Sequence, residues 1–214
     1  MRIAFLCSDQ DHPVNRYLNN WIGQHSSEHQ AELVRRKSQL KEGDFLFLIS
    51  CSEIVNSADR ESFAHTLVLH ASDLPKGRGW SPHIWEIIGG AEYLTVCLLE
   101  AADKVDAGKI WCKKIVPVPK HALWNEINNL LFSAQMELID YAISHWPDIV
   151  PESQDSSITP TYYRRRIPED STLDIEKPLS SQFDLLRVCD PNRFPALVEI
   201  NGYRYKLFLE KADE

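Results

Sequence analysis

The sequence predicts an α/β fold, with an open, mostly parallel sheet, helices on both faces, and a small C-terminal helix plus β-hairpin appendix. Three observations predict this class. Apolar segments of strand length alternate with helical patterns through residues 1–145, which is typical of α/β proteins. Residues 44–50 (DFLFLIS) are apolar almost throughout, as in a strand covered on both faces. Asn201-Gly202 joins two alternating segments and predicts a hairpin.

The elements of the sheet follow in chain order. Short apolar runs bounded by polar or turn residues predict strands at residues 2–8, 44–50, 66–70, 93–100 and 109–117. Helical spacing of apolar side chains predicts helices at residues 14–24, 83–88 and 122–145. The last of these is the longest helical pattern in the chain. This alternation of strands and helices is typical of a Rossmann-like sheet.

The chain divides into three predicted parts. Residues 1–146 hold all the strands and helices of the α/β pattern and are expected to form the main domain. Residues 147–160 (PDIVPESQDSSITP) carry three prolines among polar residues, so they are interpreted as a surface linker. Residues 161–214 form a predicted C-terminal subdomain, with a short helix at 180–188 and a hairpin whose strands are 196–200 and 203–209.

Composition excludes several classes of protein. The 23 Lys+Arg and 31 Asp+Glu residues give a formal net charge of −8, which opposes binding to nucleic acid or to an anionic membrane. Five cysteines, with no C-x-x-C pair, indicate reduced thiols and a cytoplasmic protein rather than disulfides or zinc. His25 and His29 flank Glu28 without the H-E-x-x-H pattern, so no metal is expected. No apolar run approaches the ~18 residues of a membrane span.

The strongest sign of chemistry is the segment that follows the strand at 66–70. This strand ends at His70 and continues into a loop rich in Gly, Pro and charged residues. Ligands of open α/β sheets sit outside the carboxyl ends of the strands. A histidine at that position can donate a hydrogen bond or accept a proton. Asp106 follows the strand at 93–100, with Gly108 permitting a tight turn, so His70 and Asp106 are expected at the carboxyl edge of neighbouring strands.

These residues resemble a known family. The segment of residues 70–82 (HASDLPKGRGWSP) resembles the His-Pro-Ser-Leu-Leu-Pro…Arg-Gly…Pro signature of folate-dependent formyltransferases, and residues 105–108 (VDAG) resemble the family's Val-Asp-x-Gly turn. Residues 161–170 (TYYRRRIPED) are similar to the region after the catalytic domain in nucleotide-sugar N-formyltransferases. The resemblance implies transfer of a formyl group from N10-formyltetrahydrofolate to a nucleotide-linked amino deoxysugar, as in the biosynthesis of lipopolysaccharide.

The resemblance also implies roles for individual residues. His70 and Asp106 correspond to the catalytic pair. The walls of the folate site would be formed by Ile54, Val55, Ala102, Asp103 and Val105. The sugar nucleotide would be bound by Lys76, Arg78, Trp80, Tyr162, Tyr163, Arg164 and Arg165. For the aromatic residues and the arginine run, packing or a solvated surface remains an equal alternative, and residues 161–214 complete either the acceptor site or a homodimer interface.

One position departs from the family pattern. The family has an asparagine two residues before the histidine, which donates a hydrogen bond to the formyl oxygen, whereas this chain has Val68. Either another donor replaces it, such as Ser52 or Asn56, or the chemistry is altered. Two other functions therefore remain open: a methionyl-tRNA formyltransferase-like enzyme, opposed by the acidic balance and the lack of room for a full tRNA-binding domain, and a non-catalytic module that binds folate or a nucleotide sugar.

Overall fold

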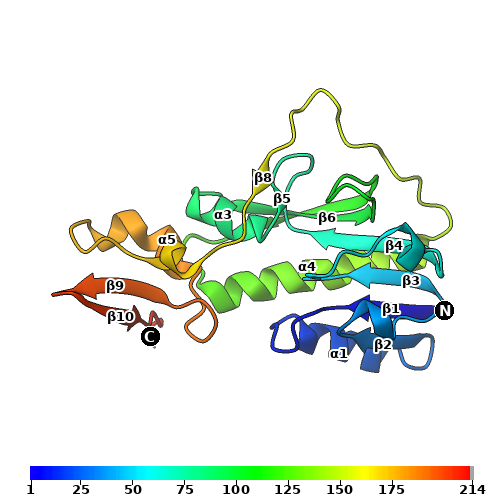
Figure 1. Ribbon diagram of the computed structural model, residues 1–214, viewed down its shortest axis with the longest axis horizontal. Helices are drawn as coiled ribbons and strands as arrows, with labels where there is room; N and C mark the ends of the chain where they lie inside the picture. Colours follow the sequence, from blue (N-terminus) through cyan, green and yellow to red (C-terminus); the bar gives the residue numbers. More distant parts are fainter. Residues whose placement is uncertain (213–214) are drawn as a thin grey trace.

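The computed structural model describes residues 1–212 and shows the α/β architecture that the sequence predicts (Figure 1). The central sheet has six strands in the order β2-β1-β3-β4-β6-β7. Their bounds are β1 Arg2–Leu6, β2 Gln30–Val34, β3 Gly43–Leu48, β4 Phe63–His70, β6 Tyr93–Glu100 and β7 Ile110–Pro117. The first four run parallel, while β6 is antiparallel to β4 and β7 is antiparallel to β6. The sheet is therefore mixed but mostly parallel.

Five helices and two small strand pairs accompany the sheet. The helices are α1 Asn15–Gln24, α2 Ser57–Arg60, α3 Pro82–Ile88, α4 Trp124–His145 and α5 Phe183–Arg187, with short 3-10 turns η1 Lys37–Gln39, η2 Pro168–Ser171 and η3 Leu179–Gln182. β5 Arg78–Gly79 pairs in parallel with β8 Tyr162–Tyr163, and β9 Ala196–Ile200 pairs antiparallel with β10 Tyr203–Leu207. The edge strand β2 escapes prediction because it is short and only its last residue is buried.

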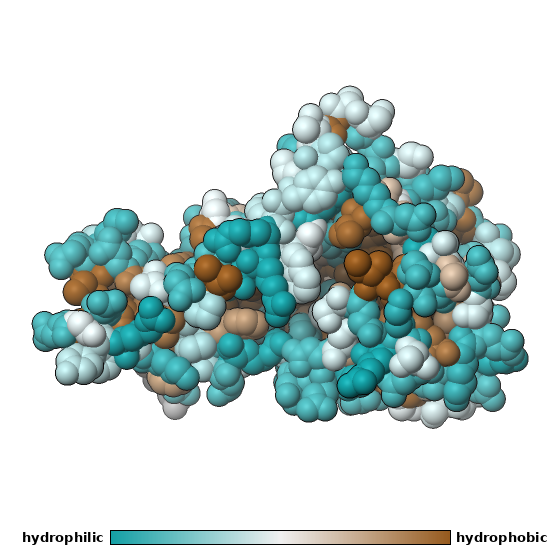
Figure 2. All heavy atoms as spheres, in the orientation of Figure 1, coloured by the Kyte–Doolittle hydropathy of each residue, from teal (hydrophilic) through white to brown (hydrophobic). Residues whose placement is uncertain are grey.

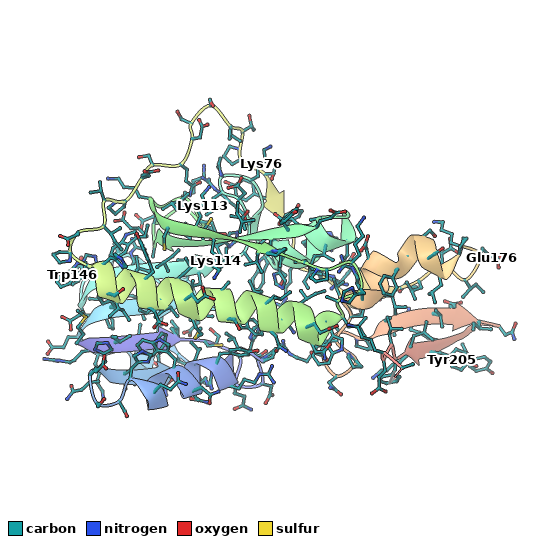
Figure 3. All side chains as sticks on the ribbon, turned by 180° about the vertical axis from the view of Figure 1, so that it is seen from behind. Lys76, Lys113, Lys114, Trp146, Glu176 and Tyr205 are labelled. Atoms are coloured by element: carbon teal, nitrogen blue, oxygen red, sulfur yellow. The ribbon has the colours of Figure 1, made fainter. Side chains whose placement is uncertain are left out.

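The two faces of the sheet are covered differently. On one face, side chains of α1 and α4 close the largest hydrophobic cluster, which contains Phe5, Phe45 and Phe47 of the strands. Figure 3 shows α4 running along the back of the molecule toward the C-terminal elements. On the other face, the strand side chains pack mainly against loop residues such as Leu40, Val55 and Ala101. The long helices therefore cover one face, while loops bury much of the second face, where the sequence also predicts helices.

The C-terminal elements form a small unit of their own. Asn201 (φ 52°) and Gly202 (φ 78°) make the tight turn between β9 and β10, as the Asn-Gly pair predicts. Leu173, Leu186 and Ala196 belong to the small core beneath the hairpin. In Figure 1 this unit lies beyond the sheet end to which the arrows of β1, β3 and β4 point. The division at residues 146 and 160 stays a prediction.

The segment predicted as a surface linker is tied to the sheet. Glu152 forms a bridge with Ile110 at the start of β7, with reciprocal backbone hydrogen bonds of 2.7 and 2.9 Å. In Figure 1 this segment arches over the sheet and then enters β8 beside β5. Its path therefore brings residues near 162 next to the loop after His70.

No helix of residues 1–212 is long and apolar enough to cross a membrane.

Candidate active site

His70 is fixed at the end of β4 by the loop that follows it. Its side chain is 7% exposed, and the ring Nε2 lies 2.9 Å from the carbonyl oxygen of Gly77. That oxygen can only accept a hydrogen bond, so Nε2 carries the hydrogen and Nδ1 is the nitrogen that can exchange a proton. The Ser72 hydroxyl donates to the Lys76 carbonyl at 2.8 Å and closes the same loop. The loop therefore sets the orientation of the imidazole.

Asp106 meets His70 from the turn between β6 and β7. The carboxylate Oδ2 lies 3.6 Å from His70 Nδ1, and it accepts a hydrogen bond from the Gly79 backbone N–H at 2.9 Å. Its side chain is only 9% exposed. The expected position at a shared carboxyl edge is wrong in one respect: β6 runs antiparallel to β4, so Asp106 reaches His70 through the folding of its loop. His70 Nδ1 and Asp106 Oδ2 nevertheless lie close enough for the carboxylate to stabilise a proton on the imidazole.

Gln154 holds the Asp106 turn in place. Its side-chain amide donates to the carbonyl oxygens of Asp106 (2.8 Å) and Gly108 (2.9 Å), and its Oε1 accepts from Arg78 at 2.6 Å. A Cβ on Gly108 would lie 1.8 Å from the carbonyl oxygen of Glu100, so only glycine fits this close turn. Sequence reasoning missed Gln154 because nothing in a proline-rich polar segment distinguishes one glutamine that points inward.

Arg78 supports the site rather than facing a ligand. It is 5% exposed, and its guanidinium donates to Gln154 and to the Tyr162 hydroxyl at 3.2 Å. Its backbone N–H donates to the Thr161 carbonyl just before β8, and that of Trp80 donates to the Tyr163 carbonyl. Both Nη atoms bond to protein groups and Nε lacks a hydrogen-bond partner among residues 1–212, so this buried guanidinium is poorly placed for a diphosphate, and its binding role stays a prediction.

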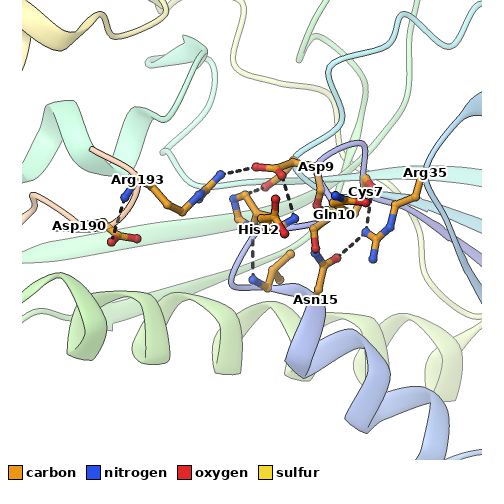
Figure 4. A network of polar contacts seen from close by, with 11 residues as sticks. Cys7, Asp9, Gln10, His12, Asn15, Arg35, Asp190 and Arg193 are labelled. Atoms are coloured by element: carbon orange, nitrogen blue, oxygen red, sulfur yellow. Dashed lines mark hydrogen bonds and ion pairs between the residues drawn. The ribbon is translucent and has the colours of Figure 1, made fainter. Parts of the chain in front are cut away.

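Two further histidines lie near His70. Burial lowers the pKa of His83 to about 3, and the charges of His12 and His70 act in the same direction, so both lie close enough to affect His83. Burial also lowers the pKa of His12 to about 4, with the Arg193 charge contributing. Figure 4 shows Arg193 reaching from the C-terminal unit to Asp9 in the loop that carries His12. Their wide separation in sequence hides this cluster from sequence analysis.

The two loops predicted to form the folate site lie side by side. Arg60 joins them, since its guanidinium donates to the Val55 carbonyl at 2.9 Å and to Asp103 at 2.7 Å. Ile54 is 82% exposed and Val105 is 60% exposed, while Val55 is buried and Ala102 is exposed. Figure 2 shows hydrophobic groups on the face of the molecule that carries the loop between β3 and α2. Sequence reasoning missed Arg60, which defines the spacing of these loops.

Arginine and aromatic side chains alternate beside β8. The Arg165 guanidinium lies 5.1 Å from the ring centroid of Trp80, and that of Arg164 lies 5.1 Å from Trp85. The Trp85 and Tyr163 rings are stacked with centroids 6.2 Å apart. A hydrogen bond from Arg164 lowers the pKa of Asp170 to about 2, so this arginine is already paired.

Trp80 and Tyr162 are 43% and 56% exposed, so both can still meet a ligand. Lys76 is exposed on the loop beyond His70, and Figure 3 labels it below the arching segment.

Residues 1–142 match the family model described as formyl transferase. The chain belongs to this family. The match covers the strands of the six-stranded sheet and most of α4, and it includes His70 and Asp106. The predicted family is therefore confirmed. Among curated relatives, a methionyl-tRNA formyltransferase from Ruegeria pomeroyi is 28% identical over 149 residues, which are 69% of this chain and 48% of that protein. The chain thus spans about half the length of this relative.

Solved structures share the fold of this formyl transferase chain. A methionyl-tRNA formyltransferase from Clostridium thermocellum superposes with a TM-score of 0.77 at 20% identity, covering 95% of this chain and 90% of that one. HypX from Aquifex aeolicus, in complex with tetrahydrofolic acid, gives 0.75 at 19% identity, covering 98% and 37%. A sugar N-formyltransferase from Shewanella sp. FDAARGOS_354 gives 0.70 at 14% identity, covering 100% and 99%. At these identities the likeness shows the fold alone.

Proposed function

We propose that this chain transfers a formyl group from N10-formyltetrahydrofolate to the amine of a nucleotide-linked amino deoxysugar. The observation that carries the proposal is the buried His70–Asp106 pair, with 3.6 Å between Nδ1 and Oδ2, at the open end of β4. Such an enzyme would act in the cytoplasm, in the biosynthesis of lipopolysaccharide or a similar surface polysaccharide. Membership of the formyl transferase family supports the reaction.

The loops joined by Arg60 fit a folate as the formyl donor. A pterin is flat, with an apolar ring face and an edge of hydrogen-bonding groups, and ligand sites commonly combine apolar walls with a few polar atoms. Ile54 and Val105 supply exposed apolar side chains, and Thr66 Oγ1 on β4 is buried without a hydrogen-bond partner among residues 1–212. The tetrahydrofolate complex of HypX, which has the same fold, supports this assignment. When bound, the folate supplies an activated formyl carbon.

The catalytic residues act on the protons of the amine. An amine attacks only as the neutral species, so a base must accept its surplus proton. His70 Nδ1 is the free nitrogen of the ring, since Nε2 is bound to the Gly77 carbonyl. Asp106 lies beside Nδ1 and stabilises the proton that arrives there. Because Gly79 and Gln154 fix Asp106, the pair needs little rearrangement during the reaction.

The proposed acceptor site lies over β5 and β8. The exposed rings of Trp80 and Tyr162 offer faces on which a base or sugar can stack, a contact worth about 1–3 kcal/mol per base in nucleic-acid complexes. Arg165 and Lys76 are exposed cations available to a diphosphate, whereas Arg78 and Arg164 are already bound to protein groups. The sugar N-formyltransferase from Shewanella has the same fold over its whole length, which supports this acceptor.

A methionyl-tRNA acceptor is the second candidate. The matches to methionyl-tRNA formyltransferases from Ruegeria pomeroyi and Clostridium thermocellum favour it. The net charge of −8 disfavours it, since binding of a polyanion needs clustered excess cation. A non-catalytic module that binds folate or a nucleotide sugar is the third candidate, and Val68 is the residue that raises it.

A steady-state assay separates the three candidates. The protein is mixed with N10-formyltetrahydrofolate and, in turn, with 3-amino and 4-amino deoxysugar nucleotides and methionyl-tRNA. Our proposal predicts that tetrahydrofolate appears together with one formylated sugar nucleotide, and that both products are lost in His70→Ala. Formylation of methionyl-tRNA alone would establish the second candidate. Binding of folate without transfer to any acceptor would establish the third.

A further inference from the structure

Ser50 and His70 lie at the same open edge of the sheet, after β3 and at the end of β4. Leu48 of β3 pairs with Val68 of β4 in parallel register, and Ser50 and His70 each follow two residues later. Neighbouring strands lie about 4.8 Å apart, so the two backbones emerge side by side. Ser50 is exposed, and its φ of 48° is in the left-handed region that serine rarely adopts. Strained positions of this kind often occur at functional sites.

His12 fixes the direction of the Ser50 hydroxyl. The Val14 backbone N–H donates to His12 Nδ1 at 3.2 Å, so the ring hydrogen is on Nε2. His12 Nε2 lies 3.1 Å from Ser50 Oγ and donates to it. This contact uses a lone pair of the hydroxyl oxygen and leaves the hydroxyl hydrogen free. Within residues 1–212 the hydroxyl hydrogen of Ser50 has no acceptor.

Formyl transfer needs a donor near His70 that the other residues do not supply. Negative charge grows on the formyl oxygen in the transition state, and a donor aimed at such an oxygen typically contributes ~10²–10³ in rate. Val68, two residues before His70 on the same face of β4, has no donor. The backbone N–H groups of residues 76–80 all bond to protein acceptors already.

The two replacements expected from the sequence are less suitable. Ser50 follows Leu48 by the same two residues that separate His70 from Val68, the register partner of Leu48, whereas Ser52 and Asn56 lie two and six residues further along the chain.

We propose that the Ser50 hydroxyl donates the hydrogen bond that stabilises the formyl oxygen during transfer, with His12 as its positioning residue. This inference rests on the proposed function. The amine lone pair forms the new C–N bond, the carbonyl π electrons move to the oxygen, and Ser50 Oγ–H bonds to it without losing its proton. The amine proton passes to His70 Nδ1. When the carbonyl re-forms, the bond to N10 breaks, and N10 takes that proton to leave tetrahydrofolate.

Substitutions at Ser50 test the proposal in the whole chain. Ser50→Gly removes the hydroxyl while the positive φ suits glycine, so the fold is retained. We expect Ser50→Gly and Ser50→Ala to lower kcat by ~10²-fold or more, with an unchanged Kd for folate. Ser52→Ala tests the competing donor two residues further along and should keep wild-type kcat, whereas a loss of ~10²-fold in Ser52→Ala alone would overturn the proposal. A kcat for Ser50→Gly within threefold of wild type would overturn the proposal. Val68→Asn should bring no gain, and a gain would count against Ser50.

A second measurement needs no amine substrate. Infrared spectra of 10-formylfolate, labelled with ¹³C at the formyl carbon, report the hydrogen bond to the formyl oxygen directly. The carbonyl band should lie at lower frequency on the wild-type protein than on Ser50→Gly, and equal frequencies would overturn the proposal. If the wild-type protein binds 10-formylfolate but formylates no acceptor, the proposed function fails while this band still tests Ser50. If it does not bind 10-formylfolate, both proposals fail.

His12 has its own test, because its role is to orient Ser50. His12→Phe should lower kcat on its own. The double variant with Ser50→Ala should be no slower than Ser50→Ala alone, since the partner of His12 is already absent. Additive losses would show that His12 acts elsewhere.

Discussion

Gly79 and Gly90 form a matched pair of substitutions that isolates the contact between β5 and β8. Both have positive φ angles, 97° and 88°, so alanine costs about 1–2 kcal/mol of backbone strain at either position. A Cβ on Gly90 meets nothing within 4 Å. A Cβ on Gly79 would lie 2.5 Å from the Tyr163 carbonyl oxygen, where real contacts stay beyond 3.0 Å, so the two strands must separate by about 0.5 Å.

That separation disturbs two hydrogen bonds at the site. The Trp80 N–H donates to Tyr163 at 3.1 Å, and the Gly79 N–H donates to the Asp106 carboxylate at 2.9 Å. A neutral hydrogen bond contributes about 0.5–1.5 kcal/mol and one to a charged group about 1.5–3 kcal/mol. Gly79→Ala should therefore destabilise the fold by about 2–4 kcal/mol more than Gly90→Ala. For a chain of this size the difference in Tm is roughly 4–16 °C.

Thermal and urea unfolding of the two variants measure this difference. Formyl transfer should fall in Gly79→Ala, because Asp106 loses the donor that orients it, and should persist in Gly90→Ala. Equal losses of stability in the two variants, with equal activity, would refute the account of how β8 supports the site.

Three further predictions concern the pair, the folate loops and pH. His70→Ala and Asp106→Ala should each lower kcat by ~10²-fold or more with little change in Tm, and near-full turnover in either would remove that residue from the mechanism. Arg60→Ala should raise the Kd for folate in a fluorescence titration, since it frees the two loops from each other, and an unchanged Kd would contradict that role. Burial raises the pKa of Glu86 from 4.5 to about 7, with the Asp73 charge contributing. The native state therefore favours protonated Glu86. The free energy of unfolding that this protonation contributes is fully present below pH 4.5 and is lost as pH rises through 7. Glu86→Gln should remove that loss, which stays below about 3 kcal/mol at pH 8 because solvent screens this partly buried carboxyl. A variant whose free energy of unfolding falls with pH as steeply as that of the wild type would contradict this prediction.

Local patterns explain most of the fold that the sequence predicts. The strand at residues 93–100 and the long helix ending at 145 follow from uninterrupted apolar periodicity, and both are found with nearly the expected bounds. The antiparallel direction of β6 has no such signal, because a strand has the same alternation in either direction. The burial of one face by loops also depends on long-range packing, which periodicity does not encode.

The candidate site shows the same limit. His70 and Asp106 belong to short motifs with recognisable neighbours, so their proximity could be anticipated. Gln154 contacts the Asp106 turn, and His12 contacts Ser50, only through tertiary structure, from segments far apart in sequence. Arg78 shows the converse. A cation beside a motif predicts contact with a ligand, but this side chain is buried and bonded to Gln154. Residue type identifies candidate chemistry, and the fold decides which side chains are free to perform it.

Transfer of an isotope-labelled formyl group tests the central claim most directly. The wild-type protein and His70→Ala are each incubated with N10-formyltetrahydrofolate carrying a ¹³C formyl group and with a panel of amino sugar nucleotides, and the products are weighed by mass spectrometry. Our account predicts that one sugar nucleotide gains the labelled formyl group with the wild-type protein and none with His70→Ala. Unlabelled sugar nucleotides throughout, or label transfer that persists without His70, would contradict it.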